Sequence, residues 1–107
     1  MISIRFERSK GCLCFFESKG HAEFEEEGLD IVCAAVSALS INAANSLEAL
    51  TEDVFTVDTG EGYLSIRLQE SPSKEAQLLM ESLALGLQAV EKDYGSQYVR
   101  VRIQEVS

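Results

Sequence analysis

The chain has 107 residues and a formal net charge of −9, with one histidine and three cysteines. The length suits a single domain over residues 1–107, and the excess of carboxylates argues against direct nucleic-acid binding, because phosphate contacts need clustered Lys and Arg. An odd number of cysteines favours reduced thiols in a cytoplasmic protein over a disulfide framework.

The first two extended segments predict a β-hairpin. Residues 2–7 alternate apolar with polar side chains, and residues 12–18 form a second extended run after the turn signal Ser9-Lys10-Gly11. We find neither a secretory leader nor an uninterrupted apolar run of the roughly 20 residues that a membrane span needs. We therefore expect a cytoplasmic protein without membrane contact.

Residues 20–37 combine the residues with the most chemical potential. The histidine, His21, precedes an acidic segment over residues 22–28, which we interpret as a loop that could close over a site. An apolar, alanine-rich helix is predicted over residues 31–50, with Asp30 as its N-cap. Its apolar character on nearly all sides predicts burial on more than one side, against a sheet and a second helix or subunit.

The second half of the chain predicts a hairpin, a helix and a final strand. Residues 54–57 and 63–68 are expected to form strands joined by the glycine-rich turn between them. Ser71 is the predicted N-cap of the second helix, with Pro72 in its first turn and Gly95 as its stop. The apolar side of this helix is expected to include Leu78, Leu79, Leu83, Leu85, Leu87 and Val90.

Residues 97–105 alternate again and predict a last strand with one solvent-facing side. The resulting order is β-β-α-β-β-α-β. The predicted fold is α+β, a largely antiparallel sheet with two helices packed against it.

Cys33 and His21 could form a thiol nucleophile and its base. A thiol near a helix start gains from the helix dipole, and eleven intervening residues are enough for the imidazole to fold back. Asp30, Cys33, Ser37 and Ser40 follow helical spacing and would form one polar stripe. Asp30 could orient His21 and Ser37 could hydrogen-bond a substrate, although a bond from Ser37 to its own helix backbone is equally compatible with the pattern.

Gly20-His21-Ala22 and the segment from Asp30 through Cys33 to Ser37 (DIVCAAVS) together resemble the ribosomal-processing cysteine proteases of bacteria known as Prp. The resemblance extends over the whole chain in length and element order. It implies that Cys33 is the nucleophile and His21 the general base, with Gly20, Asp30 and Ser37 as supporting residues. It also implies a small α+β fold, a homodimer and no cofactor.

The resemblance further implies a substrate, the precursor of large-subunit ribosomal protein L twenty-seven, from which the family removes a short N-terminal extension. The acidic surface is compatible with such a basic substrate.

Two other functions are compatible with the sequence. Cys12, Cys14, His21 and Cys33 could be metal ligands, but the Cys-x-Cys spacing differs from that of structural zinc sites. Cys12 and Cys14 are more simply explained as core residues of a strand. A non-catalytic, dimeric acidic interaction module that associates with ribosomal proteins is the remaining alternative, and it predicts that Cys33 is dispensable.

Overall fold

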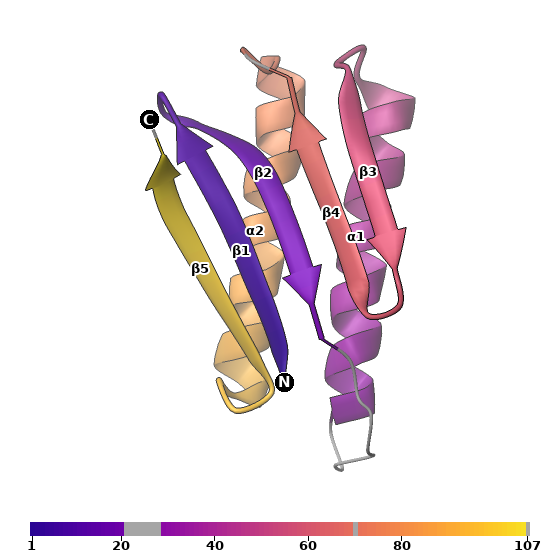
Figure 1. Cartoon of the computed structure of the whole chain (residues 1–107), viewed down its shortest axis with the longest axis vertical. Coiled ribbons are helices and arrows are strands. Elements are labelled where there is room, and N and C mark those ends of the chain that lie inside the picture. The colour runs from indigo at the N-terminus through magenta and orange to yellow at the C-terminus, as the bar shows by residue number, and fades with distance from the viewer. Residues whose placement is uncertain (21–28, 70, 107) are drawn as a thin grey trace.

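The computed structural model describes residues 1–20, 29–69 and 71–106, with Leu29 described by its backbone alone. Five strands form one sheet, and both helices cover the same face of it (Figure 1). The elements are β1 (Ile2–Ser9), β2 (Cys12–Lys19), α1 (Leu29–Leu50), β3 (Phe55–Gly60), β4 (Tyr63–Leu68), α2 (Lys74–Tyr94) and β5 (Val99–Val106). The predicted α+β fold and element order are confirmed.

The strand order is β3-β4-β2-β1-β5, and all neighbours are antiparallel except β1 and β5. Lys10 and Gly11 both have positive φ in the two-residue turn between β1 and β2, which matches the twist of a tight hairpin. Glu61 and Gly62 form the turn between β3 and β4, so β3 is longer than the predicted residues 54–57.

A β-bulge at the start of β2 decides which of its side chains enter the core. The register shifts between Glu7 and Arg8, so Cys14 is an extra residue in β2. The shift sends Leu13 and Phe16 toward the helices, where both are fully buried. The core between sheet and helices also contains Ile4, Phe6, Val32, Leu47, Ile66, Met80, Leu87 and Val99.

The beginning of α2 differs from the prediction. The N-cap is Ser73, whose hydroxyl accepts a hydrogen bond from the Ala76 backbone N–H, and neither Ser71 nor Pro72 belongs to the helix. Asp53 causes the difference, because its carboxylate accepts hydrogen bonds from both the backbone N–H and the hydroxyl of Ser73. Gly95 ends the helix as predicted.

The side chain of Gln77 in α2 completes the pairing of β2. Where β2 extends past the end of β4, the Gln77 amide accepts from the backbone N–H of Leu13 at 2.8 Å and donates to its carbonyl at 2.6 Å. This helix side chain therefore occupies the place that a neighbouring strand would take.

Among the described residues, α1 is buried along one side, where it packs against the sheet and α2. Val32, Val36 and Leu47 enter the core, whereas Ile31 and Ile41 are exposed. The segment Asp30–Leu50 meets the length and hydropathy of a membrane-spanning helix, a criterion that core helices of soluble proteins also meet. The predicted burial on more than one side is not met by the part of the chain that the structure describes, since the side of α1 opposite the core is exposed there.

Candidate active site

Cys33 lies on α1, on the side of the helix that faces the sheet. The helix begins at Leu29, two residues before the predicted start, so Cys33 is its fifth residue and opens the second turn. The prediction of Asp30 as N-cap is therefore wrong, because Asp30 is itself helical. Its exposed carboxylate lies in the first turn, where it interacts favourably with the helix dipole.

A pocket of about 390 Å³ opens beside the half-buried Cys33 thiol. α1 forms one wall, and the other is formed where β2 ends and the β3–β4 turn begins (Figure 1). Three of the predicted site residues, Gly20, Cys33 and Ser37, line this pocket together. Apolar residues, among them Val36 and Leu64, make up part of the lining beside polar ones such as Ser37 and Thr59.

Gly20 fixes the end of β2 at the rim of this pocket. Its backbone N–H donates to the Gly62 carbonyl at 2.9 Å and so ties the strand end to the β3–β4 turn. Its φ of 112° and the close carbonyl of Met1 leave no room for a Cβ atom. This position therefore requires glycine, and the chain reaches the pocket directly before His21.

The predicted polar stripe on α1 is only partly assembled. Ser37 is exposed and lines the pocket beside Cys33, but Asp30 is not among the lining residues. Ser40 also lines the pocket, and it is buried with its hydroxyl donating to the Val36 carbonyl at 2.6 Å. The helix-backbone bond that was an alternative for Ser37 is thus seen at Ser40.

His21 and the acidic segment over residues 22–28 lie outside the described residues. The predictions that His21 faces Cys33, that Asp30 orients it and that the segment closes over the site therefore remain predictions.

Tyr63 is a pocket residue that the sequence did not point to. It begins β4 and borders the pocket near Gly20, while its side chain points to the other face of the sheet, where its hydroxyl donates to a carboxylate oxygen of Glu17 at 2.9 Å. Thr59 at the end of β3 lines the same pocket. No local sequence pattern identifies these two residues, because they line the pocket only where the β3–β4 hairpin lies beside α1.

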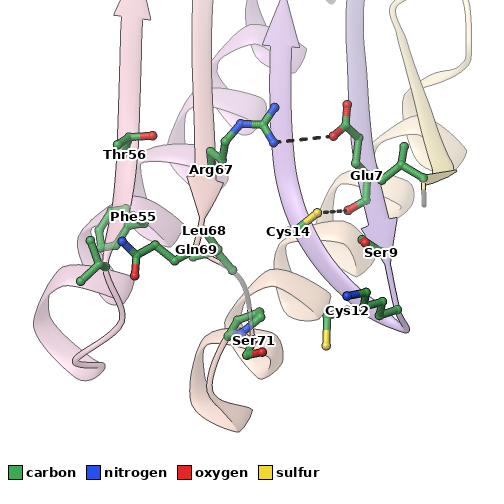
Figure 2. Close-up of a pocket in the computed structure, with 14 residues that line it drawn as sticks. Glu7, Ser9, Cys12, Cys14, Phe55, Thr56, Arg67, Leu68, Gln69 and Ser71 are labelled. Atoms are coloured by element: carbon green, nitrogen blue, oxygen red, sulfur yellow. Dashed lines mark hydrogen bonds and ion pairs between the residues drawn. The ribbon is translucent and has the colours of Figure 1, made fainter.

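A larger pocket, of about 700 Å³, lies at the opposite end of the sheet (Figure 2). Cys12 and Cys14 line it, so the prediction that they belong to the core is wrong: the bulge in β2 turns Cys14 to the uncovered face. Burial, and next the Glu7 carboxylate, raise the pKa of the Cys14 thiol, which donates a weak hydrogen bond to the Glu7 carbonyl. Among the described residues, no three His, Cys, Asp or Glu side chains are placed to hold a metal ion.

Comparison with known proteins identifies the family. Residues 1–100 match the family model for cysteine protease Prp. The chain is 40% identical over 98 residues to the ribosomal processing cysteine protease Prp of Bacillus subtilis. The aligned region covers 86% of this chain and 87% of the relative.

Two solved structures of the essential ribosomal processing protease Prp from Staphylococcus aureus have the same fold. The complex with a substrate peptide superposes with a TM-score of 0.90 at 27% identity, and the complex with a covalently linked product peptide with a TM-score of 0.86 at 28%. Each match covers 97% of this chain and 100% of the other. The chain therefore belongs to the cysteine protease Prp family, and it is a cysteine protease.

Proposed function

We propose that this protease removes the N-terminal extension of ribosomal protein L twenty-seven in the cytoplasm, with Cys33 as nucleophile and His21 as general base. The observation that carries the proposal is the shared pocket of Cys33 and Gly20. His21 follows Gly20 directly, and consecutive Cα atoms are about 3.8 Å apart, so the imidazole begins within side-chain reach of the pocket rim.

The chemistry proceeds by acyl transfer. The Cys33 thiolate attacks the scissile carbonyl, and backbone N–H groups near the start of α1, together with the Ser37 hydroxyl, stabilise the oxyanion. The C–N bond breaks as protonated His21 gives its proton to the leaving amine. Water, deprotonated by His21, then cleaves the thioester and regenerates the free thiol.

The substrate assignment is supported by the relatives and by charge. Relatives at 37–40% identity are named ribosomal processing proteases, and the Staphylococcus aureus protein has been solved with a substrate peptide. The net charge of −9 complements a basic ribosomal protein and would raise the rate of encounter at low salt.

A cleavage assay tests the proposal. Ribosomal protein L twenty-seven with its native extension is incubated with the unmodified protease, with Cys33→Ala or with His21→Ala, and product masses are measured. Cys12→Ala is the matched control, because it removes a thiol that lines the other pocket. We expect the unmodified protease and Cys12→Ala to cut the substrate once, near the substrate's N-terminus, and the other two variants not to cut it. Circular dichroism should show that all four proteases are folded.

Cleavage by folded Cys33→Ala would show that another residue is the nucleophile. If the folded, unmodified protein binds the substrate without cutting it, the non-catalytic interaction module becomes the better description.

We also infer that the protease is a homodimer that pairs through α1. The residues Ile31, Ala34, Ala38 and Ile41 are all exposed and recur at offsets of three, four and three, which gives α1 a second apolar stripe opposite the core. The two isoleucines are 58% and 54% exposed. Small alanines between them allow a second helix to approach closely, so a second copy of α1 fits this surface.

A further inference from the structure

Both helices cover one face of the sheet and leave the other uncovered (Figure 1). By strand register, the uncovered face carries four of the five arginines. Strand register sorts its central residues into three rows across the sheet. From β3 to β5 these rows read Thr56-Arg67-Phe15-Glu7-Gln104, Asp58-Ser65-Glu17-Arg5-Arg102 and Gly60-Tyr63-Lys19-Ser3-Arg100. We call this surface the open face.

The open face has the opposite charge from the rest of the chain. Its rows contain five cations and three carboxylates, which leaves four of the nine basic and fifteen of the eighteen acidic residues for the remainder. A net charge of −9 therefore does not describe this surface. The cations gather toward β1 and β5, and the exposed Asp58 lies at the far edge on β3.

Two of the guanidinium groups are held in place before any ligand arrives. Arg67 lies over the Phe15 ring at 4.2 Å and Arg5 at 4.9 Å. Carboxylates fix them further: Glu7 pairs with both, as the Arg67–Glu7 contact in Figure 2 shows, and Glu17 pairs with Arg5. Arginines that are already ordered lose little conformational entropy when they bind a ligand.

The two arginines of β5, Arg100 and Arg102, are available to bind a ligand. Arg100 and Arg102 are exposed, and within the described part of the chain neither makes a salt bridge or side-chain hydrogen bond. At a rise of about 3.3 Å per residue their side chains leave the strand about 6.6 Å apart on one side. Arg102 is in register with Arg5 on β1, which extends the cationic surface inward.

We propose that the open face binds single-stranded RNA. Arg100 and Arg102 bind backbone phosphates through their forked N–H donors, and the guanidiniums over Phe15 provide planes on which bases stack. A lipid surface fits less well, because Phe15 is only 6% exposed and cannot insert into a bilayer. An acidic protein would pair with the arginine charges but would not stack on the guanidinium planes over Phe15.

RNA binding at the open face goes beyond the proposed function, because this face lies on the side of the sheet opposite α1 and needs neither Cys33 nor His21. It differs from the expectation that net charge alone supports, which is no nucleic-acid contact. The difference arises because strand register, not composition, collects these cations on one face.

The test is fluorescence anisotropy with a labelled, mixed-sequence single-stranded RNA between about 50 and 200 mM salt. Arg100→Gln/Arg102→Gln is compared with Lys74→Gln/Lys92→Gln, which makes the same change in net charge at two exposed positions on α2. We expect the arginine variant to bind at least tenfold more weakly. The slope of log K against log salt should fall by about 1.4, because each lost phosphate contact on a single strand accounts for about 0.7.

The lysine variant should bind RNA like the unmodified protein, and both variants should retain peptide cleavage and thermal stability. Equal RNA affinity and salt slope for the two variants, or no binding by the unmodified protein, would overturn the proposal. Competition by poly-glutamate as effective as that by unlabelled RNA would also overturn it, in favour of an acidic protein partner. Loss of protease activity in Cys33→Ala leaves this measurement unaffected, so the two proposals fail separately.

Discussion

Gly20 couples the end of β2 to the pocket that contains Cys33. Its backbone conformation, with φ of 112°, is one that side chains rarely adopt, and an added Cβ would overlap the Met1 carbonyl. At the same time its N–H holds the β3–β4 turn through Gly62. One residue therefore sets both where the chain leaves the sheet and where the pocket wall lies.

Gly20→Ala should lower both activity and stability. Backbone strain of this kind costs about 1–3 kcal/mol, and relief of the clash moves the point from which His21 projects. We expect unfolding at lower urea concentration together with a reduced kcat in the cleavage assay.

Gly11→Ala is the matched control, because Gly11 also has a positive φ, of 82°, but an added Cβ meets no atom within 4 Å. The Gly11→Ala protein should be less stable but should keep its kcat at temperatures where it is folded. Equal loss of kcat in both variants would show that strain, and not the position of Gly20, limits activity.

At the residue scale, the sequence predicts the reactive groups but not their surroundings. Gly20, Cys33 and Ser37 could be predicted because a thiol at a helix start and a glycine before the single histidine belong to short motifs. Tyr63 could not, because it reaches the pocket only through the pairing of β4 with β2. The bulge that exposes Cys12 and Cys14 to the second pocket likewise breaks the alternation that sequence reasoning assumes.

Asp53 fastens the beginning of α2 to the segment that follows α1. Its carboxylate accepts from the hydroxyl of Ser73 and from the Ser73 backbone N–H, and these bonds lower the pKa of Asp53 below its usual range. Ser73 in turn caps α2 by accepting from Ala76 at 3.0 Å. The start of one helix thus depends on a residue twenty positions earlier.

Asp53→Asn should destabilise the protein by about 1 kcal/mol at pH 7, the typical cost of weakening a helix cap. The charged carboxylate stabilises fully above its unfolded-chain pKa of about 3.9 and ceases to do so as pH falls through its lower folded-state pKa. The difference in unfolding free energy between the two proteins should therefore shrink below about pH 4. Urea titrations from about pH 2.5 to pH 7 measure it.

Asp58→Asn, which removes an exposed carboxylate on β3, serves as the control and should change stability by less than about 0.5 kcal/mol. A deficit of Asp53→Asn that stays constant down to about pH 2.5 would contradict the role of the charge.

At the element scale, the sequence predicts which segments are helix or strand better than where they begin. Both predicted N-caps are wrong, since Asp30 lies inside α1 and the N-cap of α2 is Ser73, held by Asp53, instead of Ser71. Leu78 and Leu85 were expected on the apolar side of α2 but are exposed, and Ala76 and Met80 are buried instead. Hydrophobicity alone does not reveal which of several apolar stripes faces the sheet.

The exposed apolar stripe on α1 determines the expected assembly of the whole molecule. Ala38→Glu places a charge in the centre of this stripe and should prevent pairing, since an unpaired charge in an interface costs several kcal/mol. Sedimentation velocity should find twice the chain mass of 11.8 kDa for the unmodified protein and the single-chain mass for the variant.

Ala89→Glu changes an exposed alanine on α2 in the same way and should leave the dimer intact. Sedimentation of the unmodified protein as a single chain at high concentration would contradict the assembly, and a dimer that Ala38→Glu leaves unchanged would place the interface elsewhere.

At the scale of the whole molecule, the element order predicts the α+β class and the antiparallel hairpins, because short turns connect neighbours in space. It does not predict the strand order, since β5 could lie beside β1 or beside β3 after a helical connection. In the structure β5 lies beside β1, where the buried side chains of Ile2 and Val99 are neighbours in the core. The placement of β5 beside β1 depends on packing between segments far apart in the sequence, so no single segment predicts it.

The parallel pairing of β1 with β5 also governs when the protein can fold. Ile2 pairs with Val99, so the first strand to be synthesised waits for the last one in the described sheet. Pairings so distant in sequence slow folding, because a long loop must close before any contact compensates for the lost entropy. Until β5 leaves the ribosome, one edge of β1 is an open template for another chain. A newly made molecule therefore completes this sheet only after β5 has emerged from the ribosome.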